Sequence, residues 1–236
     1  MSNPFKFKQF TVLQDRCAMK VGTDGVLLGA WCKINQANSV LDIGAGTGVI
    51  ALMIAQRSIA ETIDALEIDT EAFEQCVDNF ETSLWGDRLF CYHASFEEFV
   101  DETEEQYDFI VSNPPFYSSS YKSKTAQRDM ARFQDALPFE TLIKGVSKLL
   151  SPKGTFATII PFSEEYNFIK LAKTFNLIPF RKTCVKGTPS SEIKRTLLQF
   201  SFQNETLEYN ELVIEISRHN YTKEYRELVK DFYLKM

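Results

Sequence analysis

The sequence is poor in the residues that mark exported, membrane-spanning and zinc-binding proteins. It holds five cysteines, an odd number with no C-x-x-C spacing, and two histidines that lie far apart. No apolar run approaches the roughly 20 residues that span a bilayer. The opening stretch MSNPFKFKQF lacks the apolar segment of a signal peptide. These absences predict a cytoplasmic protein with reduced thiols, no membrane segment and no metal site.

Acidic residues outnumber basic residues, so the net charge is −6 and the pI is about 5.1. This balance argues against a general nucleic-acid binder, although it leaves room for a local basic face. Six acidic groups in residues 97–105 account for much of the negative charge, and we interpret this stretch as a solvated helix end and loop. Basic residues cluster in residues 122–132 and 181–195.

Segments with strand character alternate with segments of helical periodicity along the chain. We predict strands over residues 39–44, 62–68, 89–94, 107–112 and 155–161, followed by two or three more near residues 178–186, 195–203 and 211–217. We predict helices over residues 47–57, 70–80, 138–150, 163–175 and 222–233. The alternation implies right-handed βαβ units. The predicted fold is therefore α/β and Rossmann-like, with a mainly parallel seven-stranded sheet, an antiparallel edge hairpin and helices on both faces.

The chain of 236 residues is long enough for one large domain with a sizeable core. We predict a single domain over residues 1–236, with residues 1–35 forming a strand and helix extension packed on it. The last helical segment has apolar residues at helical spacing and is expected to pack back on the body of the domain.

The first predicted sheet strand runs into DIGAGTG, residues 42–48, and a helix follows directly. Ligands of open α/β sheets bind beyond the carboxyl ends of the strands, and glycines there permit a tight turn and close backbone approach. A dinucleotide site would read G-x-G-x-x-G. The spacing of Gly44, Gly46 and Gly48, with Asp42 just before, is similar to the S-adenosylmethionine site of Rossmann-like methyltransferases.

A nucleoside site of this kind needs a carboxylate about 20 residues further on, at the end of the second strand, to accept hydrogen bonds from ribose hydroxyls. Glu67 stands at that position. Asp69 is the nearby alternative, and it could instead cap the helix that follows. We favour Glu67 as the ribose-binding residue.

The fourth strand ends in SNPPF, residues 112–116, which cannot continue a central strand because proline lacks a backbone N–H. Asn113 offers a side-chain oxygen, and Pro114 offers a backbone carbonyl whose position the ring restricts. Two acceptors aimed at one point suit an aromatic NH₂ group, whose lone pair must be freed before it can attack. Phe116 can stack on the base, unless it is a core residue.

This combination resembles the N6-adenine and related amino-methyltransferases, whose fourth-strand motif reads N/D/S-P-P-Y/F. Residues 5–31, 40–57, 112–117 and 219–236 narrow the resemblance to the bacterial tRNA-Val adenine-37 N6-methyltransferase family. The likeness covers nearly the whole chain and is weaker over residues 120–215. It implies methyl transfer from S-adenosyl-L-methionine to the N6 amine of the adenine beside the anticodon of a valine tRNA.

The resemblance also implies roles for single residues. Asp42, Gly44 and Gly46 would line the methionine end of the cofactor, and Asn113, Pro114 and Phe116 would form the amine site. Residues 22–25, GTDG, open a helix whose N-terminus could meet the cofactor carboxylate.

Two parts of this assignment leave alternatives open. Thr23 and Asp24, in the GTDG stretch, are expected to bind the cofactor, or else to cap the helix that they open. Many relatives carry Asp after the third strand to bind the cofactor adenine, and Ser95 stands in that place here. Phe96 could pack on the adenine ring or belong to the core.

The expected partner is the anticodon loop of a tRNA, bound by a monomeric protein. A base in a single-stranded loop costs less to extrude than a base in a duplex. We predict that four basic residues after the catalytic motif hold the RNA backbone: Lys122, Lys124, Arg128 and Arg132. The alternative for these residues is a solvated loop.

Other functions share parts of this pattern. Release-factor glutamine methyltransferases use N-P-P-Y on another delocalised NH₂ group, but they carry a helical N-terminal domain for which this chain has no room. Ribosomal RNA or DNA adenine methylation keeps the chemistry and changes the substrate. An inert cofactor-binding scaffold is a further alternative, and an NAD oxidoreductase is disfavoured by the glycine spacing.

Overall fold

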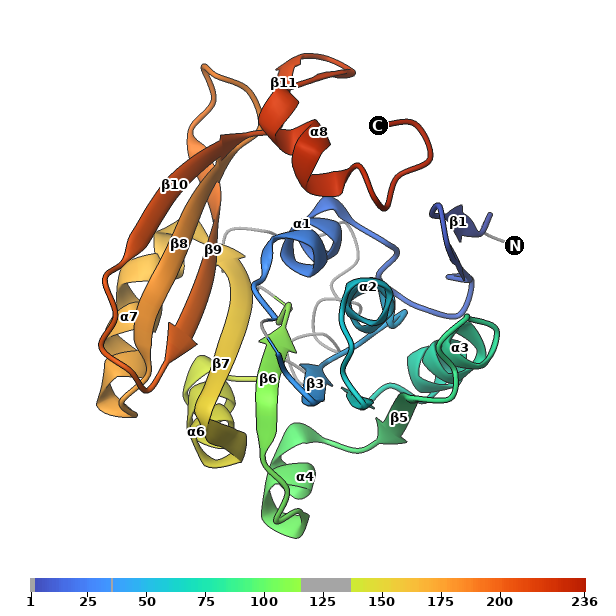
Figure 1. Ribbon diagram of the computed structural model, residues 1–236, viewed down its shortest axis with the longest axis vertical. Helices are drawn as coiled ribbons and strands as arrows, with labels where there is room; N and C mark the ends of the chain where they lie inside the picture. The colour runs from blue at the N-terminus through green and yellow to red at the C-terminus, as the bar shows by residue number, and fades with distance from the viewer. Residues whose placement is uncertain (1–2, 35, 116–136) are drawn as a thin grey trace, which may run out of the picture.

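The computed structural model describes residues 3–34, 36–115 and 137–236, and its centre is an eight-stranded sheet (Figure 1). The strands lie in the order β10-β8-β9-β7-β6-β3-β4-β5. Their bounds are β3 (Ser39–Ile43), β4 (Thr62–Glu67), β5 (Leu89–His93), β6 (Tyr107–Ser112), β7 (Leu150–Pro161), β8 (Ile178–Lys186), β9 (Ile193–Ser201) and β10 (Glu208–Val213).

The mainly parallel sheet with an antiparallel hairpin is confirmed, but its edge differs from the prediction. β9 runs antiparallel to both β7 and β8, and the other neighbouring strands pair in parallel. β10 adds to β8 outside the hairpin, so the sheet has eight strands rather than seven. Leu212 is the one fully buried residue of β10, and such a strand gives little apolar signal in the sequence.

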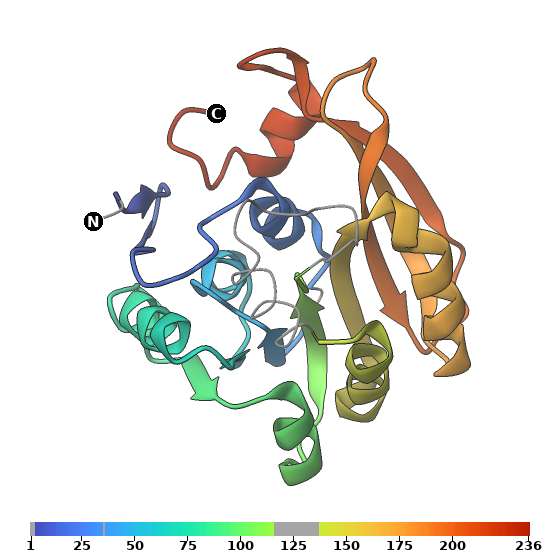
Figure 2. The ribbon, with the colours of Figure 1, turned by 180° about the vertical axis from the view of Figure 1, so that it is seen from behind.

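Helices cover both faces of the sheet, as predicted (Figures 1 and 2). Their bounds are α1 (Thr23–Trp31), α2 (Val49–Arg57), α3 (Thr70–Glu81), α4 (Phe96–Glu102), α6 (Phe139–Leu149), the 3₁₀ turn η1 (Phe162–Glu164), α7 (Glu165–Thr174) and α8 (Lys223–Val229). Helices α1, α2 and α3 pack into the core on one face, and α4, α6 and α7 pack into a second core on the other.

The two ends of the chain meet outside α1. β1 (Phe5–Lys6) pairs with β2 (Thr11–Val12), and β11 (Glu215–Ser217) pairs with β12 (Asn220–Tyr221). The backbone N–H of Lys8 donates to the Phe232 carbonyl at 2.8 Å, which ties the first strands to the tail. Helix α8 packs against α1 but ends at Val229, before the predicted end. The assignment of the chain to one domain stays a prediction.

No helix in the described ranges is long and apolar enough to cross a membrane. All five cysteines are free thiols, and four of them are buried.

Candidate active site

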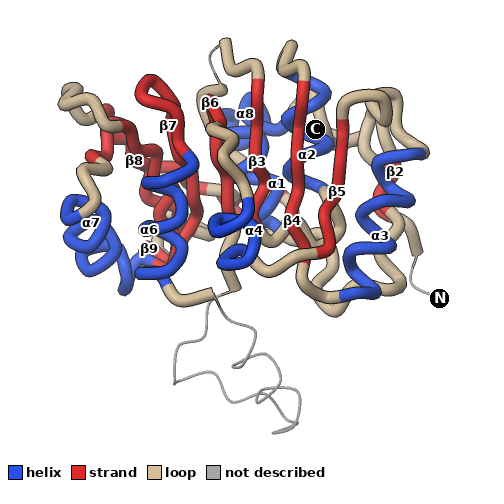
Figure 3. The backbone as a smooth tube through the Cα atoms, turned by 90° about the horizontal axis from the view of Figure 1, so that it is seen from below, coloured by secondary structure: helices blue, strands red, loops and turns tan. Residues whose placement is uncertain are grey.

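Four neighbouring parallel strands, β6, β3, β4 and β5, end together at one edge of the sheet, and several of the predicted site residues lie at or directly after these ends (Figure 3). Ile43, the last residue of β3, lies opposite Leu66 on one side and Ser112 on the other. The Ser112 hydroxyl donates to the Ile43 carbonyl at 2.9 Å. The fold therefore places the glycine turn after β3 between the end of β4 and the end of β6, where ligands of open α/β sheets bind.

The glycine turn has a backbone conformation that residues other than glycine rarely adopt. Gly44, Gly46 and Gly48 have φ angles of +73°, +56° and +75°, in the left-handed region that glycine adopts without steric cost. A Cβ atom at Gly44 or Gly46 would meet nothing within 4 Å, whereas one at Gly48 would lie 2.5 Å from Cε1 of Phe80. The first two glycines thus border open space, and the third permits close packing of the turn against α3.

Glu67 ends β4 and binds the glycine turn directly. Its carboxylate accepts hydrogen bonds from the backbone N–H of Gly46 at 2.7 Å and from that of Asp69 at 2.9 Å. Asp69 instead caps α3, since its side chain accepts a hydrogen bond from Ala72 N at 2.8 Å. The structure therefore separates the two acids: Glu67 lies beside the open glycines, and Asp69 caps a helix.

Asp42 lies behind the turn rather than in it, because its side chain is fully buried. Its Oδ2 accepts a hydrogen bond from Ala51 N of α2 at 3.2 Å. Its Oδ1 has no partner in the part of the chain that the structure describes. Burial, together with the nearby Glu67 charge, raises the pKa of Asp42 to about 7, although the Ala51 hydrogen bond opposes the shift. Direct contact of Asp42 with a cofactor stays a prediction.

The amine motif leaves the sheet directly after β6. Asn113 is half-buried, Pro114 is buried and Pro115 is half-buried. The start of α1 lies against the motif, because a Cβ atom at Gly25 would be 3.9 Å from Nδ2 of Asn113. Phe116 and the four predicted RNA-binding residues, Lys122, Lys124, Arg128 and Arg132, lie outside the described residues.

The first turn of α1 is not capped by either of its own polar side chains. Its N-cap residue is Gly22, and no side-chain hydrogen bond caps the helix. Asp24 accepts a hydrogen bond from Arg195 Nε at 2.8 Å, and Thr23 is exposed. The capping interpretation of Thr23 and Asp24 is therefore wrong, and their contact with a cofactor stays a prediction.

Ser95 has a clear local role at the start of α4. It forms a capping box with Glu98, in which its hydroxyl accepts from Glu98 N and the Glu98 carboxylate accepts from Ser95 N, each at 3.2 Å. This arrangement accounts for the serine without a cofactor, so cofactor binding by Ser95 stays a prediction. Phe96 is 6% exposed and packs against Gly145, which confirms the core interpretation of that residue.

Two residues at this edge escaped the sequence analysis. Ile68 follows Glu67 and is 52% exposed, although the predicted strand included it. His93 ends β5, lies 3.0 Å from the Ile68 carbonyl through Nε2 and stacks on Phe73. The signal for Ile68 was its place directly after Glu67, where the chain leaves the sheet.

The basic cluster in residues 181–195 is largely committed to ion pairs. The pairs are Arg181–Glu208, Lys182–Glu165, Lys186–Glu211 and Arg195–Asp24. The Arg181 guanidinium also lies 4.4 Å from the centre of the Trp31 ring. These ion pairs therefore connect β8 to β10 and to α7, and β9 to α1.

Comparisons with known proteins agree with this geometry. The family model described as "Methyltransferase small domain" matches residues 20–180. A tRNA1(Val) (adenine(37)-N6)-methyltransferase of Flavobacterium johnsoniae is 62% identical over 235 residues, covering 98% of this chain and 100% of the relative. The protein of the same name from Bacteroides fragilis is 47% identical, with full coverage of both chains.

Solved structures share the fold at low sequence identity. A predicted O-methyltransferase from Agrobacterium tumefaciens superposes with a TM-score of 0.68 at 17% identity, covering 89% of this chain and 96% of its own. A ribosomal protein L11 methylase from Lactobacillus delbrueckii gives 0.54 at 15% identity, covering 76% and 77%. These likenesses show the Rossmann-like methyltransferase fold alone.

Proposed function

Since this chain belongs to the family of tRNA1(Val) (adenine(37)-N6)-methyltransferases, we propose that it methylates the N6 amine of adenine 37 in a valine tRNA, with S-adenosylmethionine as methyl donor. One observation carries the proposal beyond the names of the relatives. Asn113 and Pro114 follow β6 at the point where the open glycine turn and Glu67 border the same edge of the sheet. This juxtaposition suits an amine acceptor beside a nucleoside cofactor.

The chain's residues fit the cofactor at this edge. Open space above Gly44 and Gly46 leaves room for a ligand close to the backbone. Glu67 keeps lone pairs beyond its two backbone hydrogen bonds, and these can accept from ribose hydroxyls. The exposed Ile68 side chain can pack against the flat face of the cofactor's adenine ring, next to the ribose. Bound S-adenosylmethionine supplies a methyl carbon that its sulfonium already activates.

The amine motif acts on the nucleophile. The N6 nitrogen of adenine is a poor nucleophile because its lone pair is delocalised into the ring. The Asn113 side-chain oxygen and the Pro114 carbonyl each accept a hydrogen bond from one N–H of this amine, which orients the nitrogen and draws it toward tetrahedral geometry. The methyl–sulfur bond would break as the new carbon–nitrogen bond forms, leaving a neutral thioether, and the N6 proton would leave to solvent during or after the transfer. Because no strong base is needed before the transfer, orientation would supply much of the catalysis.

The proposed partner is the single-stranded anticodon loop, from which a base is extruded at lower cost than from a duplex. Phe116 would stack on the adenine, and Lys122, Lys124, Arg128 and Arg132 would hold the RNA backbone. Charge reversal at the four basic residues should weaken tRNA binding and spare cofactor binding. Equal loss of both would argue against their role. We also propose that the protein acts as a monomer.

The test supplies labelled S-adenosylmethionine with three substrates in parallel: total tRNA that lacks the modification, ribosomal RNA and a release factor. Digestion and mass spectrometry identify the methylated product, and Asn113→Ala serves as the control. N6-methyladenosine from the tRNA alone, lost in the variant, is the expected result. Methylglutamine, or label only in ribosomal RNA, would overturn the assignment of tRNA as the substrate. Cofactor binding without any methyl transfer would favour the inert scaffold.

A further inference from the structure

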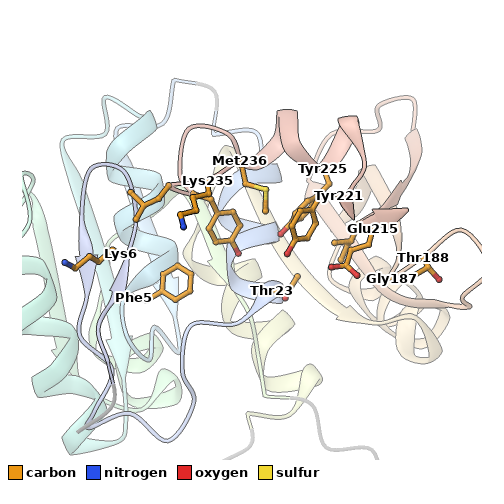
Figure 4. A pocket seen from close by; sticks show the side chains of 13 residues that line it. Phe5, Lys6, Thr23, Gly187, Thr188, Glu215, Tyr221, Tyr225, Lys235 and Met236 are labelled. Atoms are coloured by element: carbon orange, nitrogen blue, oxygen red, sulfur yellow. The ribbon is translucent and has the colours of Figure 1, made fainter. Parts of the chain in front are cut away.

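A cavity of about 720 Å³ lies between the two ends of the chain, and Thr23 at the start of α1 contributes to its lining (Figure 4). Phe5 and Lys6 lie on one side of Thr23, and Tyr221 and Glu215 lie on the other. Lys235, from the tail, borders the same space. Neither the glycine turn nor the amine motif contributes to its lining, although Thr23, a predicted cofactor-binding residue, does. The cavity is therefore distinct from the space beside the glycine turn and Glu67.

We propose that this cavity binds a nucleotide of the substrate RNA that lies next to the target adenosine in the loop. The base would stack in the aromatic part of the cavity, and Lys6 and Lys235 would pair with the backbone phosphate. The inference rests on the proposed function and deepens it, because it identifies an RNA contact outside the catalytic motif.

Position is the first reason for this assignment. Thr23 lines the cavity, and a Cβ atom at Gly25 would lie 3.9 Å from Nδ2 of Asn113. The Cα atoms of residues two apart in a chain are separated by at most about 8 Å. An adenine extruded to Asn113 is no longer stacked on its neighbours, so the extended backbone of the loop, rather than the stacking distance, spans this gap for the adjacent nucleotide.

The aromatic lining is rigid and suited to a flat ring. The Tyr221 ring is half-buried, and the Tyr225 ring supports it at a centroid distance of 5.3 Å and an angle of 33°. Tyr225 is 3% exposed and belongs to the core on this face of the sheet. Burial, reinforced by the Tyr233 hydroxyl, raises the pKa of Tyr225 and keeps it neutral. A fixed aromatic surface binds a base at little cost in side-chain entropy.

The polar lining also matches a nucleotide. Lys6 and Lys235 are exposed at the rim and can approach a phosphate. Glu215 is half-buried, and one of its oxygens accepts from His219 N at 3.3 Å, which leaves lone pairs for the amino group of a base. The volume falls in the range of small-molecule sites and exceeds what one base needs.

The experiment measures binding of a valine anticodon stem-loop RNA by fluorescence anisotropy. Tyr221→Leu removes the ring, Tyr221→Phe keeps it, and Lys6→Glu/Lys235→Glu reverses the rim charge. The matched control, Lys170→Glu/Lys173→Glu, makes the same charge change at two exposed lysines of α7, on the opposite face of the sheet. Unchanged cofactor affinity by calorimetry verifies that each variant is folded.

We expect Tyr221→Leu to weaken RNA binding roughly tenfold, and Tyr221→Phe to stay within about twofold of wild type. Lys6→Glu/Lys235→Glu should weaken binding by at least about tenfold more than the α7 control. A second set of RNAs carries an abasic site at position 36 or 38. If one of those bases fills the cavity, its removal weakens wild-type binding and abolishes the effect of Tyr221→Leu.

Three results separate the possible failures. If Tyr221→Leu binds like wild type, or loses equally on the intact RNA and on both abasic RNAs, the cavity assignment is wrong. Wild-type protein that binds the RNA with the Tyr221 dependence but does not methylate it refutes the proposed function alone. Wild-type protein that does not bind the RNA refutes both.

Discussion

The three left-handed glycines allow a sharp test, because the same substitution should have different consequences at two of them. Gly46→Ala and Gly48→Ala both place a side chain in a backbone conformation that costs about 1–2 kcal/mol. At Gly46 the new methyl group meets nothing within 4 Å, so the strain is the whole effect on stability. We expect Gly46→Ala to lose about 1–2 kcal/mol of unfolding free energy.

Gly48→Ala should lose more, because its methyl group would lie 2.5 Å from Phe80 and 2.8 Å from Cys76 Sγ. Those side chains are 2% and 0% exposed, so neither can swing into solvent. Overpacking of this kind adds about 1–3 kcal/mol. Cofactor affinity should fall more in Gly46→Ala than in Gly48→Ala, because the Gly46 methyl group would occupy the space proposed for the ligand.

The assay combines urea unfolding with calorimetric titration of S-adenosylmethionine. Phe80→Leu in the Gly48→Ala background is the matched control, and it should recover part of the lost stability by removing the clashing ring edge. Equal stability losses for Gly46→Ala and Gly48→Ala would refute the packing argument. Undiminished cofactor affinity in Gly46→Ala would refute the placement of the cofactor above the turn.

Three further substitutions test the surroundings of the site. The raised pKa of Asp42 means that its protonated form favours the folded state, so this group's contribution to stability declines as pH rises from about 3.8 to about 7. Asp42→Asn should remove that decline and gain stability relative to wild type between pH 5 and pH 8, by at most about 4 kcal/mol. Urea unfolding at a series of pH values measures this gain, and a stability difference between variant and wild type that does not change with pH would refute the raised pKa. Glu67→Gln should weaken cofactor binding by roughly 10- to 100-fold in calorimetry, because it weakens charged hydrogen bonds, and an unchanged Kd would remove Glu67 from the site. Ser95→Ala should cost about 1 kcal/mol in urea unfolding through loss of the cap, and a simultaneous loss of cofactor affinity would show that the serine also contacts the ligand.

Most of the order of strands and helices could be read from the sequence, because each central strand is a short apolar run and most of the predicted helices have a regular apolar face. Helix α4 was missed because Phe96 is its one buried residue. The glycine turn and Glu67 were predictable for a related reason, since both are local consequences of a strand that ends at the binding edge. β10 was misjudged because Leu212 is its one fully buried residue. Its pairing with β8 depends on distant chain segments rather than on its own pattern.

The side-chain partners that each residue finds in the fold account for the remaining differences. Asp24 reads as a helix cap in the sequence, but Arg195, 171 residues away, takes its carboxylate. Ser95 reads as a substitute for a cofactor-binding acid, and Glu98 turns it into half of a capping box. The cavity beside α1 joins Lys6 to Lys235, and no local pattern relates the two ends of a chain.

The most direct test of the proposed reaction uses one purified valine tRNA transcript and its analogue with purine, which lacks the 6-amino group, at position 37. Fragment mass spectrometry after nuclease digestion locates the methyl group. We predict methylation at N6 of adenine 37, none in the purine analogue, and a loss of transfer in Asn113→Ala at unchanged cofactor affinity. Methylation of the purine analogue, or full transfer by Asn113→Ala, would contradict the role of the amine motif.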